Sequence, residues 1–293
     1  MSETSSTAVA LYQGPALAVL QKDNEALEDL RENIMLGGGL TEKDIRKVKN
    51  PSGGQLMFEI GRAAGEPEYV RELTGVALAV LPRRTLWANK NVDSGEFPVC
   101  SSTDMVNGAK RRGEDGGVDI PLNILDVGVP GGEAGKCAGC PFDEWGSGVD
   151  EAGKPTDGKR CTESRIIYFL RTGDILPVKM TVPSSSLGKF GLSVKALPAA
   201  ISKSVVKVSL SKEETRGGKK VAMYNVEFVG KLDPASIEGL KAYRPLVDKL
   251  IENASAERTD ETEAERYSRG GRGGRAAKER EEIPEDQRFG DNK

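Results

Sequence analysis

Four cysteines constrain this chain more than any other feature: they are Cys100, Cys137, Cys140 and Cys161, spaced C-x36-C-x2-C-x20-C. Two thiols on one tight turn can chelate a single metal ion, because the intervening Ala138-Gly139 step lets both sulfurs point to the same side. The chain has no histidine, so a four-thiolate zinc site is the natural tetrahedral site. We therefore predict one structural Zn²⁺, which clips a glycine-rich insertion, residues 98–161, onto the apolar segment after Cys161.

Other chemistry of the same cysteines stays open. Four cysteines allow three disulfide pairings, although disulfides are rare in the cytosol. The Cys137–Cys140 pair also has the spacing of a thioredoxin-like redox motif, but the other two cysteines would then have no role. An open catalytic zinc is disfavoured, because four thiolates leave no coordination position for a substrate.

Composition separates a folded part of the chain from its ends. Only 37% of the 293 residues are apolar, 30% are charged and 35 are glycine, so part of the chain is expected to be unpacked. We predict a disordered N-terminus over residues 1–13, a core over 14–253 and a disordered tail over 254–293. Neither a signal peptide nor an apolar run of membrane-spanning length is visible, which predicts a cytoplasmic protein with no membrane partner.

Hydrophobic periodicity predicts more strands than helices. Strands are expected at 56–60 and 73–81, and hairpins at 165–170 with 175–182 and at 205–210 with 221–229. Helices are expected at 17–35, 41–48, 184–197 and 234–253. This pattern predicts a mainly β, α+β fold: a β-barrel or curled sheet with helical additions.

The chain carries several distinctive local motifs. They are Asn50-Pro51-Ser52-Gly53-Gly54, Arg83-Arg84-Thr85-Leu86-Trp87, Cys100-Ser101-Ser102-Thr103-Asp104, the block from Cys137 to Ser147, Cys161, Leu176-Pro177 and Pro183-Ser184-Ser185-Ser186-Leu187. Together these motifs resemble a family of phage and prophage proteins. The resemblance covers roughly residues 30–230, and the cysteine block is its most specific part. In function, the chain is similar to the broader group of phage single-stranded-DNA-binding proteins with an OB-type barrel, some of which carry a structural zinc. The resemblance implies a role in DNA replication or recombination inside the host cell. The resemblance also implies that partner proteins dock on the acidic C-terminal tail. This tail departs from the bacterial pattern, because residues follow Phe289 and the docking tip does not end in a terminal carboxylate there.

The residues themselves supply candidates for single-strand binding, which pairs cations for phosphates with aromatic faces for bases. They are Arg83, Arg84, Trp87 and Lys90 on one segment, Lys110, Arg111 and Arg112 on a polar loop, and Phe142 and Trp145 in the cysteine block. Each tryptophan is alternatively a packing residue, and the basic loop is alternatively just solvated. The tail segment from Arg269 to Arg275 has the Arg-Gly-Gly pattern of disordered nucleic-acid binders, or is simply a solvated tail.

Enzyme chemistry finds no support in the sequence. There is no histidine for general base or metal chemistry, and no phosphate-binding G-x-x-x-x-G-K-[ST] motif. The sequence therefore predicts a non-enzymatic protein that binds single-stranded DNA without sequence preference. The alternative is a zinc-stabilised adaptor that binds a host or phage replication or transcription protein.

Overall fold

The computed structural model describes residues 10–12, 14, 29, 32–34, 36, 44–50, 55–61, 66–86, 100–107, 109–110, 136–149, 154–214 and 220–256. The chain divides into two compact units, Met1–Asn253 and Ala254–Lys293. The elements below belong to the first unit, and its last helix ends shortly after the boundary. No described helix is both long and apolar enough to span a membrane.

The described part of the chain is mainly β with a few helices. Its strands are β1 (Lys47–Lys49), β2 (Phe58–Ile60), β3 (Glu68–Val70), β4 (Glu72–Leu86), β5 (Cys100–Ser102), β6 (Ala109–Lys110), β7 (Gly148–Val149), β8 (Pro155–Thr156), β9 (Thr162–Arg171), β10 (Val178–Val182), β11 (Ser204–Glu214) and β12 (Lys220–Lys231). Its helices are the 3-10 turns η2 (Pro141–Asp143), η3 (Ser184–Ser186) and η4 (Ile201–Lys203), and the α-helices α3 (Leu187–Lys195) and α4 (Pro234–Ala256).

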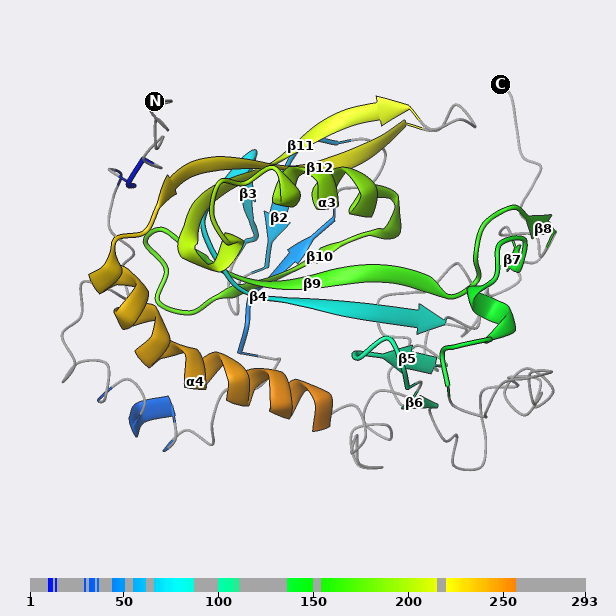
Figure 1. Cartoon of the computed structure of the whole chain (residues 1–293), viewed down its shortest axis with the longest axis horizontal. Coiled ribbons are helices and arrows are strands. Elements are labelled where there is room, and N and C mark those ends of the chain that lie inside the picture. The colour runs from blue at the N-terminus through cyan, green and yellow to red at the C-terminus, as the bar shows by residue number, and fades with distance from the viewer. Residues whose placement is uncertain are drawn as a thin grey trace, which may run out of the picture. The chain divides into compact units, whose positions relative to one another are not determined.

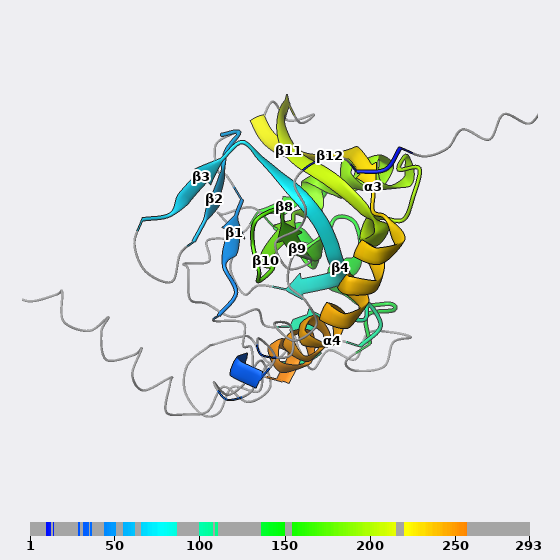
Figure 2. The same ribbon diagram turned by 90° about the vertical axis from the view of Figure 1, so that its left-hand side faces the viewer.

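Ten strands form one curled, half-barrel sheet (Figures 1 and 2). Its order is β12-β11-β4-β9-β10-β1-β2-β3, and β5 and β6 extend it from β4. Only β1 and β10 pair in parallel among the described strands. A separate two-stranded sheet, β7-β8, lies between Cys140 and Cys161.

Most predicted elements are present. Both predicted hairpins form, as β9–β10 and β11–β12, and the two later helices form as η3–α3 and α4. The predicted helix over 41–48 is wrong in its described part, because Lys47–Lys49 is strand β1. Its partners explain the error: Val48 pairs with Ile60 of β2 and with Met180 of β10, and neither contact is local. Of the predicted helix over 17–35, the described residues Asp29 and 32–34 are helical.

Strand β9 shows why the sheet is buried on both faces. Its residues Ile166, Tyr168 and Leu170 point to one face, where they pack with α4 residues such as Tyr243. The alternate residues, Ile167 and Phe169, join the other cluster. Because successive side chains on a strand alternate, a continuous apolar run is what a two-sided core requires.

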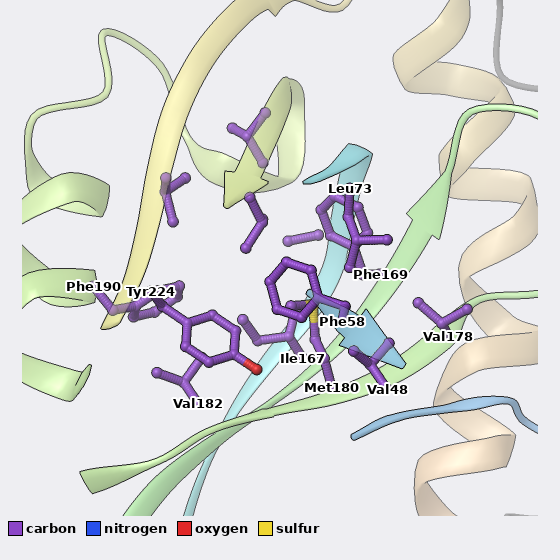
Figure 3. Packing of buried hydrophobic residues seen from close by; sticks show 14 of the residues in the cluster. Val48, Phe58, Leu73, Ile167, Phe169, Val178, Met180, Val182, Phe190 and Tyr224 are labelled. Carbon is purple, nitrogen blue, oxygen red and sulfur yellow. The ribbon is translucent and has the colours of Figure 1, made fainter. Parts of the chain in front are cut away.

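The second cluster fills the concave side of the curl. Figure 3 shows Phe58, Phe169 and Met180 converging there with Tyr224, while Phe190 arrives from α3. The rings of Phe58 and Tyr224 lie 5.6 Å apart in a tilted arrangement. This packing holds β2 against β12 and α3, and it closes the curl without any contribution from the cysteine block.

Strands β4 and β9 run on past the core. The fifteen residues of β4 span about 50 Å at roughly 3.3 Å per residue. Beyond Leu81 they pair with the start of β9 and with β5, and Figure 1 shows β5 to β8 gathered at this end. The four cysteines belong to this extension.

Candidate nucleic-acid interface and metal centre

The turn from Cys137 to Cys140 is built as the sequence predicts. Gly139 has φ 70°, a left-handed conformation that glycine adopts without a Cβ penalty. The Cys140 amide donates to the Cys137 carbonyl at 3.2 Å, which closes the turn. The Asp143 amide then donates to the Cys140 carbonyl at 2.9 Å, so Cys140 leads directly into η2.

The other two cysteines lie on either side of the end of β4. Cys100 pairs with Leu86 across β4 and β5. Thr85 pairs with Thr162 across β4 and β9, which places Cys161 level with the same Leu86. The Cys161 amide donates to the Phe142 carbonyl at 2.8 Å and so reaches the segment that follows the Cys137–Cys140 turn.

Three of the thiols lie close enough to interact electrostatically, since those of Cys140 and Cys100 both act on Cys161. Burial, followed by the neighbouring Cys140, Asp143 and Cys100, raises the pKa of the Cys161 thiol to about 12, while Arg84 opposes the rise. All four cysteines are described and none forms a disulfide. Thiols are soft donors that suit Zn²⁺, and the Asp143 carboxylate also lies near enough to Cys161 to act on it. Within the described residues, no group of three or more Cys, Asp or Glu side chains has the arrangement of an assembled metal site.

The loop after β5 fixes where Cys137 lies. The carboxylate of Asp104 accepts hydrogen bonds from the amides of Val106 and Asn107, at 2.8 and 2.7 Å, and from the Asn107 side chain at 2.7 Å. These bonds, that from the Asn107 amide first, hold the pKa of Asp104 well below its usual value. The Val106 carbonyl accepts the Cys137 amide at 2.8 Å, and Lys136 donates to the Asn107 side chain at 2.8 Å.

The cysteine block has almost no apolar core of its own. We use the name platform lobe for residues 136–149 and 154–161. In this lobe Cys137 is the only buried apolar side chain, and neither core cluster includes a lobe residue. Polar contacts hold it together instead: the Ser147 hydroxyl donates to the Phe142 carbonyl at 3.1 Å and accepts the Arg160 amide at 3.1 Å. Segments this small usually need a metal or disulfides to stay folded.

Asp143 joins the platform lobe to the sheet. Its two carboxylate oxygens meet Arg84 of β4 at 2.8 Å and Lys159 at 3.0 Å. Only 18% of the Arg84 side chain and 22% of the Asp143 side chain are exposed. Arg84, a predicted phosphate contact, is therefore already occupied by a carboxylate within the protein.

Trp145 stands out from the surface of the platform lobe. It is 79% exposed, and the next residue, Gly146, has φ 87°, a left-handed conformation suited to the turn at this position. The Lys159 ammonium lies 5.5 Å from the centre of the Trp145 ring. Phe142 is half-buried, with the Arg160 guanidinium 6.0 Å from its ring centre. Both ring–cation pairs therefore belong to the platform lobe, and we call these four residues the Trp145 platform.

The other predicted nucleic-acid contacts lie on strands β4 and β6 or outside the described residues. Arg83 lies on β4 opposite Ser164 of β9, and Lys110 ends β6 opposite Cys100. Trp87, Lys90, Arg111, Arg112 and the Arg-Gly-Gly segment lie outside the described residues. Lys159 and Arg160 were not predicted from the sequence. Their position directly before Cys161 was a usable signal, because the predicted zinc site already placed Cys161 beside Phe142 and Trp145.

Comparison of the chain with protein-family models, curated proteins and solved structures gave no match.

Proposed function

We propose that this protein binds single-stranded DNA without sequence preference, in the replication or recombination of a phage or mobile element. The observation that carries the proposal is Trp145, a large aromatic side chain that is 79% exposed and has a cation 5.5 Å from its ring. Tryptophan is highly buried on average, so an exposed ring beside cations favours a binding role.

The chemistry of such a site needs no base code. A base stacks on the Trp145 ring, which contributes about 1–3 kcal/mol per base and is tolerant of sequence because every base has a π-face. Lys159 and Arg160 supply charge for the adjoining phosphates. Lys159 also pairs with Asp143 at 3.0 Å, so a phosphate competes with a carboxylate for part of its charge.

The proposal includes one structural Zn²⁺ held by Cys100, Cys137, Cys140 and Cys161. Thiolates are donors that suit this ion, and four of them would close its coordination sphere, so the ion would contribute folding free energy to the platform lobe rather than reaction chemistry. We also propose that the curled sheet is an OB-like barrel, with a zinc-binding insertion over residues 98–161. The curled sheet supports that relationship, and OB folds commonly bind single strands.

A second function remains in competition, that of a zinc-stabilised adaptor for a replication or transcription protein. The specific observation in its favour is the pairing of Arg84 with Asp143, which takes one cation away from a nucleic-acid site. Exposed tryptophan is also enriched at protein–protein hot spots. Salt dependence separates the two functions, because each phosphate contact with a single strand contributes about −0.7 to the slope of log affinity against log salt.

The direct test is fluorescence anisotropy of labelled oligo-dT with the zinc-loaded full chain at low salt. We expect Trp145→Ala to weaken binding by about 1–3 kcal/mol, and Trp145→Phe to retain much of the affinity. The free energy of unfolding should change by less than about 0.5 kcal/mol in Trp145→Ala, because the ring is on the surface. Tyr69→Ala is the matched control, since Tyr69 is also aromatic and 57% exposed but lies on β3. An oligo-dT affinity that is absent, or independent of salt, would overturn the proposal in favour of the adaptor.

A further inference from the structure

The Trp145 platform and the cysteines are parts of one continuous structure. Phe142 accepts the Cys161 amide through its carbonyl at 2.8 Å, and Asp143 donates its amide to the Cys140 carbonyl at 2.9 Å. Lys159 lies two positions before Cys161, and Trp145 lies in the turn directly after η2. Any change in the relative positions of Cys140 and Cys161 therefore moves the ring and its cations with respect to each other.

The platform lobe lacks an apolar core that could hold this geometry in place. The platform lobe contributes nothing to either apolar cluster, so burial does not fix the orientation of Trp145. The ties described for the lobe include hydrogen bonds, the short β7–β8 pairing and the two ion pairs of Asp143, which exchange readily with water. Without a cross-link between its two ends, the lobe has almost no apolar burial to offset the conformational entropy of ordering it.

The apolar packing of the β core does not involve the lobe. Its two clusters are built from the central strands, α3 and α4, and they include none of the four cysteines. Loss of an ion at the cysteines is therefore expected to release the lobe while the sheet stays folded, as a local rather than a global unfolding event.

We infer that a metal ion at the four cysteines acts as an effector of the Trp145 platform: single-strand affinity depends on metal occupancy. This inference rests on the proposed function and adds its regulation. The metal-bound lobe presents Trp145, Lys159 and Arg160 in one arrangement, whereas the metal-free lobe must pay the ordering cost at each binding event. By thermodynamic linkage, bound single strand must in turn tighten metal binding by the same factor.

The test measures both halves of the linkage on the full chain. Oligo-dT affinity is determined by anisotropy for zinc-loaded protein, for protein stripped with a chelator that is then removed by dialysis, and for stripped protein reloaded with zinc. Zinc affinity is determined by competition with a chromogenic chelator, with and without saturating oligo-dT. Far-UV circular dichroism and thermal unfolding of the same samples monitor the β core.

We expect stripping to weaken oligo-dT binding by about 5–150-fold, the range of one lost stacking contact, and reloading to restore it. Oligo-dT should tighten zinc binding by a matching factor, and the circular dichroism of the core should persist without zinc. In Trp145→Ala the effect of stripping should be smaller, because the contact through which the coupling acts is missing. The Tyr69→Ala control should respond to stripping as the wild type does.

Each contrary outcome has a distinct meaning. If zinc-loaded protein fails to bind oligo-dT, the proposed function is wrong. If loaded and stripped protein bind oligo-dT equally well, the function stands and the coupling is refuted. The coupling is equally refuted if zinc does not bind at all, or if stripping unfolds the core together with the lobe, because the dependence is then not a property of the platform.

Discussion

Replacing Arg84 by alanine distinguishes a structural cation from a phosphate contact. In the structure Arg84 pairs with Asp143 at 2.8 Å, and both side chains are largely buried. At an effective dielectric constant of about 20, two charges about 4 Å apart attract by about 4 kcal/mol, and desolvation offsets much of this gain. Arg84 Nε is also buried with no hydrogen-bond partner in the described part of the chain, which lowers the net contribution further. Asp143 also pairs with Lys159 at 3.0 Å, so it should retain one cationic partner in Arg84→Ala.

The expected loss in Arg84→Ala is therefore about 1–2 kcal/mol of unfolding free energy, well below the cost of leaving a buried charge without a partner. Urea denaturation of zinc-loaded protein measures it. A double-mutant cycle with Asp143→Asn should return most of that loss as coupling energy, because the two residues contact each other directly. Arg165→Ala is the matched control: Arg165 pairs with Glu163 at 2.6 Å but with more exposed side chains, so its loss should be within about 1 kcal/mol.

The salt dependence of oligo-dT binding gives the second measurement on the same variant. If Arg84 is occupied by Asp143, the slope of log affinity against log salt stays that of the wild type. A slope reduced by about 0.7 with unchanged unfolding free energy would make Arg84 a phosphate contact and refute the structural assignment.

Two further predictions address the fold. A Cβ built on Gly75 would lie 2.0 Å from the Leu170 carbonyl oxygen of the neighbouring strand, so Gly75→Ala should cost about 1–3 kcal/mol or more in thermal unfolding. Gly188→Ala, which has open space in α3, should be neutral or stabilising, and a tolerated Gly75→Ala would contradict the strand spacing. The depressed pKa of Asp104 contributes stability that is present above its unfolded value of 3.8 and is lost as pH falls toward the folded pKa. Asp104→Asn should therefore lose stability at neutral pH, and its difference from the wild type should shrink between about pH 4 and pH 2; a difference independent of pH would contradict this role.

Local patterns predicted the parts of the fold that depend on local contacts. The β9–β10 and β11–β12 hairpins each have a polar turn between two apolar runs, and both signals lie within a short stretch of sequence. The order of the sheet is different in kind, because it depends on pairings such as β1 with β10, which are distant in sequence. A segment of three residues, Lys47–Lys49, has no periodicity of its own, and those distant partners make it a strand.

The candidate site shows the same division. The spacing of the cysteines predicted the tight turn at Gly139, and a positive φ is observed there. The ion-pairing role of Arg84 could not be predicted from the sequence, because the long connection from β5 to η2 separates it from its partner Asp143. Exposure of Trp145 was equally unreadable, since tryptophan next to a cysteine turn is compatible with packing against it. Among the described candidates, the structure favours Trp145 on the platform lobe over Arg84 on β4 as a nucleic-acid contact.

The arrangement of the two long strands explains how a lobe without a core can still present a defined surface. Strands β4 and β9 pair from Gly75 to Thr85, and only the first part of this ladder lies between the two apolar clusters. The far part carries Arg84 to its ion pair with Asp143 and ends next to Cys161, so the ladder connects the core to one side of the platform lobe. The other side of the lobe, from Cys137 to Trp145, meets the ladder through hydrogen bonds, ion pairs and the cysteines. Substitutions along the ladder should therefore change unfolding free energy, whereas changes at the cysteines should act first on the Trp145 platform.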